Sequence, residues 1–266
     1  MQSWYTHFGL TDDPFDATSS SFRYYYGARY GLFSLRFERA LEERRGHVLV
    51  TGPAGTGKST LVKTVLGRAG VCAHAAVSAA EAAPVAVIDA LLRSREPLES
   101  GFSATRKRAA LLELVERARR SQRSIVCVVD DAHLAAPGQI RELADALDIT
   151  PEARRVIQLV LVGRSRLLLT LQSRALARVA SRVATRIETD LLSPAEIADF
   201  LFERLEGSGA ADPAAVLPPA SMTAIARHAR GNIAVASALG RAVLARAAQA
   251  GARSVSAEMV DEAAAV

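Results

Sequence analysis

The segment between residues 47 and 68 constrains the fold of this chain more than any other. It begins with the short, apolar and β-branched run HVLVT at 47–51 and continues as GPAGTGKS at 52–59, after which residues 60–67 have the composition of a helix. A strand that passes through a glycine-rich loop directly into a helix is typical of a sheet covered by helices. The segment therefore predicts an α/β fold.

The same loop has the chemistry of a phosphate-binding site. Its spacing, G-x-x-x-x-G-K-S, lets backbone N–H groups and the positive end of the following helix surround a phosphate. Lys58 is expected to reach the β- and γ-phosphate oxygens, and Ser59 to ligate the magnesium ion that bridges them. The sequence thus predicts a site for ATP and Mg²⁺ formed by Gly52, Pro53, Ala54, Gly55, Thr56, Gly57, Lys58, Ser59 and Thr60.

An acidic pair follows a second apolar run. Residues 125–129 read as a buried strand, and Asp130 and Asp131 come directly after it. We expect Asp130 to hold the magnesium ion through water and Asp131 to be the base that activates the attacking water. A turn with a helix cap is the alternative for such a pair taken alone. Together with the glycine-rich loop, the pair predicts a catalytic site for hydrolysis.

The remaining pattern alternates strands with helices and then becomes purely helical. Further strands are expected at 71–77, 156–162 and 186–189, with helices at 84–93, 105–120, 139–148 and 165–179. This alternation predicts a mostly parallel sheet covered on both faces, in a three-layer αβα architecture. After residue 192 only helices are expected, and Ser193 with Glu196 forms a capping box at the start of the first one.

These patterns divide the chain into three parts. Residues 1–45 are interpreted as an aromatic leader and a helix that pack on the nucleotide domain, 46–190 as the αβα P-loop domain, and 191–266 as a small, all-helical lid domain. In the leader, the tyrosines at 24–26 either anchor the segment or close the nucleotide cleft. His133, just after the acidic pair, either couples the γ-phosphate to a neighbouring element or is a surface histidine.

Composition narrows the function only a little. The net charge of +5 arises from 33 basic and 28 acidic residues, which permits a nucleic-acid partner without favouring one. No apolar stretch reaches the length of a membrane span and no secretory signal is present, so we expect a cytoplasmic protein, including one held at the inner face of the inner membrane through a partner. Cys72 and Cys127 are expected to be buried thiols.

Motifs spread over nearly the whole chain resemble one family. Together, the motifs resemble the AAA+ ATPases of the general secretion pathway protein A (ExeA-like) family, whose relatives include ATPase regulators of DNA transposition. The motifs are Tyr5-x-x-Phe8-Gly9-Leu10 with Pro14-Phe15, the P-loop, Asp130-Asp131-Ala132-His133, Leu161-Val162-Gly163, Arg182-Val183, Leu192-Ser193-Pro194-x-Glu196-Ile197, Arg204-Leu205 and Ser256-Ala257-Glu258-Met259-Val260-x-x-Ala263.

The resemblance implies an αβα nucleotide domain with a helical lid, assembled into a homo-oligomeric ring with ATP between subunits. Arg182 matches the family's arginine finger, which reaches the γ-phosphate of a neighbouring subunit, and Arg186 is the alternative. The chain departs from the family at Asp131, where Glu is usual, and this predicts slow hydrolysis. It also departs at Ala234, which occupies the position of the family's lid arginine, and after Gly163, where the family usually has an amide side chain.

Three functions follow from this resemblance. The first is an ATPase that drives the assembly or remodelling of an envelope secretion, pilus or exopolysaccharide-export system. The second is an ATP-dependent regulator that binds duplex DNA, in which the arginines between residues 106 and 123 contact phosphates; the alternative for these arginines is a solvated helix face that pairs with Glu113 and Glu116. The third is a nucleotide-gated scaffold that hydrolyses little ATP, as Asp131 and Ala234 suggest.

Overall fold

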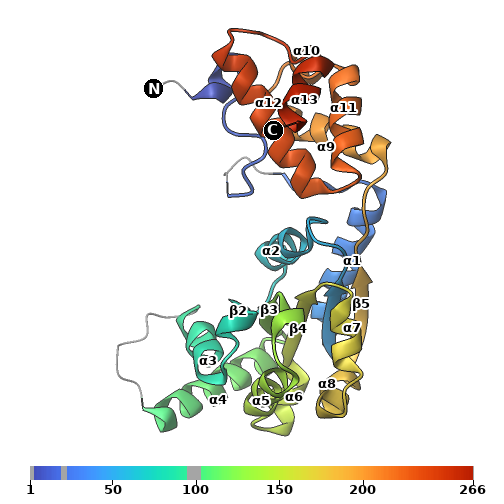
Figure 1. The fold of residues 1–266 in the computed structure, drawn as a ribbon. Helices are drawn as coiled ribbons and strands as arrows, with labels where there is room; N and C mark the ends of the chain where they lie inside the picture. Colours follow the sequence, from blue (N-terminus) through green and yellow to red (C-terminus); the bar gives the residue numbers. More distant parts are fainter. Residues whose placement is uncertain (1–2, 19–22, 95–102, 266) are drawn as a thin grey trace. The chain divides into compact units, whose positions relative to one another are not determined.

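The computed structural model describes residues 3–18, 23–94 and 103–265 (Figure 1). Residues 1–2 and 19–22 of the predicted leader, and residue 266, lie outside this set. The chain forms two compact units: Leu32–Pro53 with Leu61–Thr189, and Met1–Gly31 with Ala54–Thr60 and Asp190–Val266. The three functional parts proposed from the sequence stay a prediction.

The first unit is built on a parallel sheet of five strands. Their order across the sheet is β2-β3-β4-β1-β5, and every neighbouring pair is parallel. Such connections require crossovers, which the helices between the strands supply. The strands are β1 (His47–Thr51), β2 (Ala73–Ser78), β3 (Ile125–Asp130), β4 (Ile157–Gly163) and β5 (Val183–Glu188).

Burial of the strands explains their sequences. All residues of β1 and β4 are buried, as are the first five of β3, which is why these strands read as continuous apolar runs. The two outer strands, β2 and β5, alternate between buried and more exposed positions. Helices flank the sheet, so the predicted three-layer αβα P-loop fold with a helical C-terminal part is confirmed.

Most helices of this region lie where the periodicity places them. The expected helix at 165–179 is instead three short pieces, because Ser173 has an extended backbone that ends α7 and starts a 3₁₀ turn. A short helix that was not predicted, α6, begins at Thr150 as N-cap with Pro151 in its first turn. The helices are α1 (Ala28–Glu43), α2 (Lys58–Arg68), α3 (Pro84–Arg93), α4 (Ala104–Arg120), α5 (Pro137–Leu147), α6 (Pro151–Val156), α7 (Arg166–Leu171) and α8 (Ala177–Ala180), with 3₁₀ turns η2 (Ala79–Glu81), η3 (Ala132–Leu134) and η4 (Arg174–Leu176).

The second unit gathers both ends of the chain around a set of helices. The capping box of Ser193 and Glu196 is present at the start of α9, as predicted. Arg29 binds Glu196 at 2.9 Å and thereby lowers the pKa of that carboxyl group. The elements are η1 (Trp4–Phe8), α9 (Pro194–Gly207), α10 (Pro213–Val216), α11 (Pro219–Ala229), α12 (Ile233–Gln249) and α13 (Ala257–Ala264).

The N-terminal residues of this unit pack on its C-terminal helices. The backbone N–H of Thr11 donates to the carbonyl of Ser208 at 2.9 Å, and Asp13 forms an ion pair with Arg241 at 2.8 Å. The Tyr25 ring meets Phe200 of α9 edge to face, with ring centroids 5.7 Å apart. These contacts agree with an anchoring role for the tyrosine run. Among the helices of the described residues, none is both long and apolar enough to cross a bilayer.

Candidate nucleotide-binding site

The glycine-rich loop joins β1 to α2 as the sequence predicts. β1 ends at Thr51 and α2 begins at Lys58. Gly55 and Gly57 have φ angles of 74° and 78°, in the left-handed region that residues with a Cβ rarely occupy. The glycines of the motif are therefore required by the backbone path of the loop, and this path is compatible with N–H groups that surround a phosphate.

The loop combines buried and exposed positions. The side chains of Thr56 and Lys58 are buried, while Ser59 is exposed in the first turn of α2. The first backbone N–H groups of a helix have no partner within it, so the start of α2 is suited to an anion. Lys58 adds a cation at the same turn. Lys58 and the start of α2 thus provide the charge that a di- or triphosphate requires.

Three carbonyl oxygens of the loop are bound from elsewhere in the same compact unit. The carbonyls of residues 54, 55 and 56 accept hydrogen bonds from Asn232 Nδ2 at 3.1 Å, from the Ala234 N–H at 3.1 Å and from the Tyr30 hydroxyl at 2.6 Å, respectively. Neither Asn232 nor Tyr30 was predicted as a site residue. A signal existed for Asn232: it is the only asparagine in the chain, and it lies between a glycine and a helical pattern, where N-caps occur.

The acidic pair lies at the carboxyl end of β3. Asp130 is the last residue of the strand, and its Oδ1 accepts a hydrogen bond from the Asp131 N–H at 2.9 Å. Asp131 has a left-handed backbone, with φ of 50° and ψ of 32°, and its side chain is 65% exposed. Aspartate tolerates this conformation better than most residues. The carboxylate of Asp131 is thus accessible to a water molecule.

Sheet topology places these segments on one edge. Thr51, which precedes the glycine-rich loop, pairs with Gly163 at the end of β4, and β4 in turn pairs with β3. The carboxyl ends of parallel strands point the same way, so the start of the loop and the acidic pair lie on the same edge, with β4 between them. Ligands of open α/β sheets bind outside this edge.

His133 is buried rather than a surface histidine. Its side chain is 9% exposed, and its Nδ1 lies 3.8 Å from Asp131 Oδ1. A Cβ atom built on Gly163 would come within 3.1 Å of the His133 backbone nitrogen and 3.2 Å of Nδ1. The absence of a side chain at Gly163 therefore leaves room for His133 beside the acidic pair.

Arg182 is held within its own subunit. It precedes β5 and binds Asp148 Oδ1 through Nη1 at 2.7 Å and the carbonyl of Arg154 through Nη2 at 2.8 Å. Asp148, which is almost fully buried, also binds Arg178 at 2.9 Å. The alternative, Arg186, lies on the exposed face of β5.

The C-terminal helices contain no arginine at the expected lid position. Ala234, in the first turn of α12, contributes only its backbone N–H to the loop. Arg230 is exposed at the end of α11 with a left-handed φ of 48°. It lines an open pocket of about 690 Å³ together with Leu191, Asn232 and Val235. The structure does not place the Arg230 guanidinium on the glycine-rich loop.

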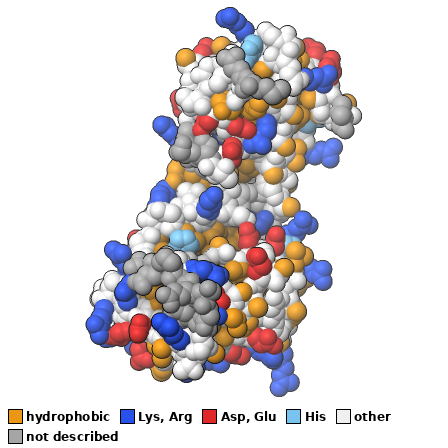
Figure 2. All heavy atoms as spheres, turned by 90° about the vertical axis from the view of Figure 1, so that its left-hand side faces the viewer, with side chains coloured by type: hydrophobic (Ala, Val, Ile, Leu, Met, Phe, Trp, Pro, Cys, Tyr) orange, Lys and Arg blue, Asp and Glu red, His pale blue; other side chains and the backbone are white. Residues whose placement is uncertain are grey.

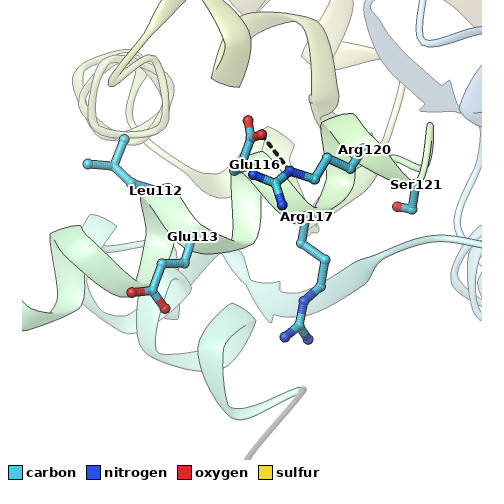
Figure 3. A pocket seen from close by; sticks show the side chains of 6 residues that line it. All are labelled: Leu112, Glu113, Glu116, Arg117, Arg120 and Ser121. Carbon is cyan, nitrogen blue, oxygen red and sulfur yellow. Dashed lines mark hydrogen bonds and ion pairs between the residues drawn. The ribbon is translucent and has the colours of Figure 1, made fainter.

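The arginine-rich stretch on α4 is partly neutralised by its own helix. Glu116 binds both Arg119 and Arg120, at 2.8 Å and 2.7 Å, and these contacts lower the pKa of the Glu116 carboxyl group to about 2. Figure 3 shows Arg120 turned toward Glu116, and Arg117 pointing away from it. The pairing of Arg119 and Arg120 with Glu116 agrees with a solvated helix face for that part of the stretch.

Comparisons with known proteins agree with this geometry. Residues 41–171 match the model of the AAA domain family. This region is an AAA domain. It contains the glycine-rich loop, the acidic pair and four of the five strands, so the AAA domain carries the proposed nucleotide site, and the fold implies nucleotide binding.

The resemblance to general secretion pathway protein A is also confirmed. The chain is 24% identical to that protein from Aeromonas hydrophila over 218 residues, which cover 77% of this chain and 38% of the relative. The chain thus spans well under half the length of the curated relative.

Solved structures of AAA+ ATPases share the fold. They include the ORC2 protein of Aeropyrum pernix, with a TM-score of 0.71, 17% identity, and coverage of 97% of this chain and 72% of that one. Cdc6p of Pyrobaculum aerophilum has a TM-score of 0.70 and 20% identity, with coverage of 96% of this chain and 70% of that one. The RuvB Holliday junction branch migration motor of Thermotoga maritima has a TM-score of 0.59 and 21% identity, with coverage of 88% of this chain and 66% of that one. At these identities the likeness concerns the fold.

Proposed function

We propose that this chain is an AAA+ ATPase that binds ATP with Mg²⁺ at residues 52–60, and that it couples slow hydrolysis to the assembly or remodelling of a secretion, pilus or exopolysaccharide-export system. The observation that carries the proposal is the complete P-loop between β1 and α2, together with the acidic residue Asp130 at the end of β3. The similarity to general secretion pathway protein A supports the class of machinery.

Hard oxygen donors are present for the magnesium ion. Mg²⁺ keeps several water ligands in proteins and is held by one or two oxygen side chains together with substrate phosphates. The Ser59 hydroxyl, which is exposed, and the Asp130 carboxylate, at the carboxyl end of β3, are donors of this kind. When bound, the ion neutralises charge on the phosphates. Ser59 and Asp130 would hold it, and Lys58 would bind the β- and γ-phosphate oxygens.

Asp131 is assigned the role of base. Its exposed carboxylate follows Asp130 directly and can accept a proton from the attacking water. Glutamate, which is usual in the family, is one methylene longer, so Asp131 has a shorter reach and slower hydrolysis is expected. A nucleotide-gated scaffold is the alternative that Asp131 and the alanine at position 234 favour, and tight ATP binding without turnover would establish it.

Assembly with ATP between subunits is the expected working form. In this form Arg182 contacts the nucleotide of a neighbour and stabilises the charge of phosphoryl transfer. Arg182→Ala should leave ATP binding intact and suppress turnover and ATP-dependent assembly. Arg178→Ala is the matched control, because Arg178 binds the same Asp148. Equal turnover in the two variants would move the role to Arg186.

The experiment that tests the proposed function is ATP turnover as a function of protein concentration, with and without duplex DNA, at low and physiological salt. Turnover that rises cooperatively with concentration and ignores DNA supports an envelope-assembly ATPase. Stimulation by DNA that weakens with salt would instead establish the DNA-binding regulator. On the face drawn in Figure 2, the described Lys and Arg side chains are interspersed with Asp and Glu.

A further inference from the structure

The backbone of the P-loop is fixed from one side. The carbonyl oxygens of residues 54–56 accept one hydrogen bond each, from Asn232, Ala234 and Tyr30, at 3.1, 3.1 and 2.6 Å. All of these residues belong to the same compact unit. Three consecutive carbonyls bound in this way leave little freedom for the peptide planes between them.

These bonds also determine where the N–H groups point. In a planar trans peptide, the carbonyl of one residue and the N–H of the next point in opposite directions, and the described residues contain no cis peptide bond. The N–H groups of residues 55–57 are therefore directed away from Asn232 and Tyr30. Backbone N–H groups at these positions are the ones that a P-loop offers to phosphates.

The side chain of Asn232 contacts both the start of α12 and the P-loop. Its Oδ1 accepts hydrogen bonds from the N–H groups of Ala234 and Val235, at 3.0 Å and 3.2 Å, and so caps α12. Its Nδ2 donates to Ala54. A Cβ atom on Gly55 would overlap the Asn232 side chain, so the loop and this side chain fit closely. The start of α12 and the P-loop thus share one side chain.

Tyr30 supplies the third hydrogen bond from a buried position. Its side chain is 2% exposed, and its hydroxyl donates to the Thr56 carbonyl at 2.6 Å. Burial raises the pKa of this hydroxyl above its usual value, so it keeps its proton at neutral pH and stays a donor. Phenylalanine at this position would fill the same space without the donor.

We propose that Asn232 and Tyr30 are positioning residues that hold the P-loop N–H groups in the direction required by phosphate, so that bound nucleotide and the start of α12 stabilise each other. This inference rests on the proposed function, because it names the residues that prepare the same nucleotide site. It also assigns to a side-chain amide and a backbone N–H the link between the P-loop and the C-terminal helices.

Two substitutions test the proposal. Asn232→Ser keeps an oxygen that can cap α12 but is too short to reach Ala54, and Tyr30→Phe removes only the hydroxyl. Two further variants are matched controls. Ser256→Ala removes the cap of α13, in which the Ser256 hydroxyl accepts a hydrogen bond from the Met259 N–H. Tyr25→Phe removes a hydroxyl that makes no hydrogen bond among the described residues.

Two measurements are made on each protein. The first is the Kd for Mg·ADP by calorimetry, and the second is hydrogen exchange of residues 55–58 without nucleotide. Each test variant should weaken binding by about three- to tenfold, the effect of one lost hydrogen bond, and should speed up exchange of the loop. The two controls should leave both quantities at the wild-type level.

Wild-type affinity and wild-type loop exchange in both test variants would overturn the proposal. A different result would contradict the proposed function. If the wild-type chain bound no Mg·ADP, or if the Lys58→Ala variant bound it equally well, the nucleotide site itself would be wrong. Exchange in the nucleotide-free protein would still decide whether Asn232 and Tyr30 fix the loop backbone.

Discussion

At the scale of single residues, Lys58 offers the sharpest test of the nucleotide site. Lys58→Ala removes the only lysine of the P-loop and should abolish measurable ATP binding, because no other cation replaces its contact with the β- and γ-phosphates. Lys63→Ala is the matched control, since Lys63 lies on the same helix and is exposed. Calorimetry with Mg·ATP checks both. Tight binding by the Lys58 variant would contradict the site.

Asp131 is tested by changing its charge and its length separately. Asp131→Asn should lower kcat by about a hundredfold or more while Kd for ATP stays constant, because only the proton acceptor is lost. Asp131→Glu should raise kcat by extending the carboxylate, although the left-handed backbone at this position opposes the change. Steady-state turnover at saturating ATP gives kcat, and calorimetry gives Kd. A kcat that falls in the glutamate variant would show that carboxylate length does not limit hydrolysis.

The residues that could be predicted from the sequence are those whose role is local. The P-loop motif can be recognised from its own residue spacing, and Asp130 directly follows its strand, so both could be found without knowledge of distant residues. His133, Tyr30 and Asn232 act through neighbours far away in the chain. No local pattern indicates that a glycine at 163 makes room for His133, or that a lone asparagine binds the P-loop.

At the scale of secondary-structure elements, the start of β1 contains a pH-sensitive residue. His47 is buried, and its Nδ1 accepts a hydrogen bond from the Leu159 N–H at 3.1 Å, which requires the neutral ring. Burial, with a smaller contribution from the charge of Arg182, lowers the pKa of His47 to about 3. The unfolded chain takes up this proton near its ordinary pKa of about 6.5, so acid favours unfolding.

His47 should therefore make the fold less stable as pH falls from about 6.5 toward 3, by up to about 1.4 kcal/mol per pH unit. Urea unfolding at several pH values measures this slope. His47→Asn supplies an acceptor for Leu159 that does not titrate, so the variant should show a shallower pH dependence. The same slope in both proteins would contradict the assignment to His47.

At the end of α5, the carboxylate of Asp148 binds several arginine side chains. Asp148→Asn should lower the free energy of unfolding by about 1–3 kcal/mol, because the substitution removes the buried negative charge that binds the arginine side chains. Arg182→Ala should cost less in the Asp148→Asn background than in the wild type, since the two residues share one interaction. Chemical denaturation of the four proteins checks this. Additive losses would mean that Arg182 acts independently of Asp148.

Elements with strong periodicity or a buried apolar run could be predicted; elements with weaker signals could not. β1 and β4 are buried on both sides and have continuous apolar sequences. β5 is an outer strand without a continuous apolar run, so only residues 186–189 were expected. The break in the helix expected at 165–179 depends on tertiary packing, because its sequence remains compatible with one continuous helix.

At the scale of the whole molecule, the two cysteines report on unfolding. Cys72 and Cys127 are free and buried, and burial raises the pKa of the Cys127 thiol to about 12. Neither should react with a thiol reagent in the native protein, because both side chains are buried and the ionisation of Cys127 is suppressed as well. Both should react in denaturant, and Mg·ATP should slow the reaction under marginal conditions. Rapid labelling of the native chain would contradict the packing of β3.

The two compact units are interleaved in the sequence, and this has a consequence for biosynthesis. Residues 32–53 and 61–189 leave the ribosome early and can complete the parallel sheet while translation continues. The P-loop is made among them, but the partners of its carbonyls include Asn232 and Ala234, which are synthesised after the sheet. A nascent chain therefore has its sheet before its P-loop is fixed. If Asn232 and Ala234 fix the loop as proposed, nucleotide binding should begin only after residues 232–234 have left the ribosome.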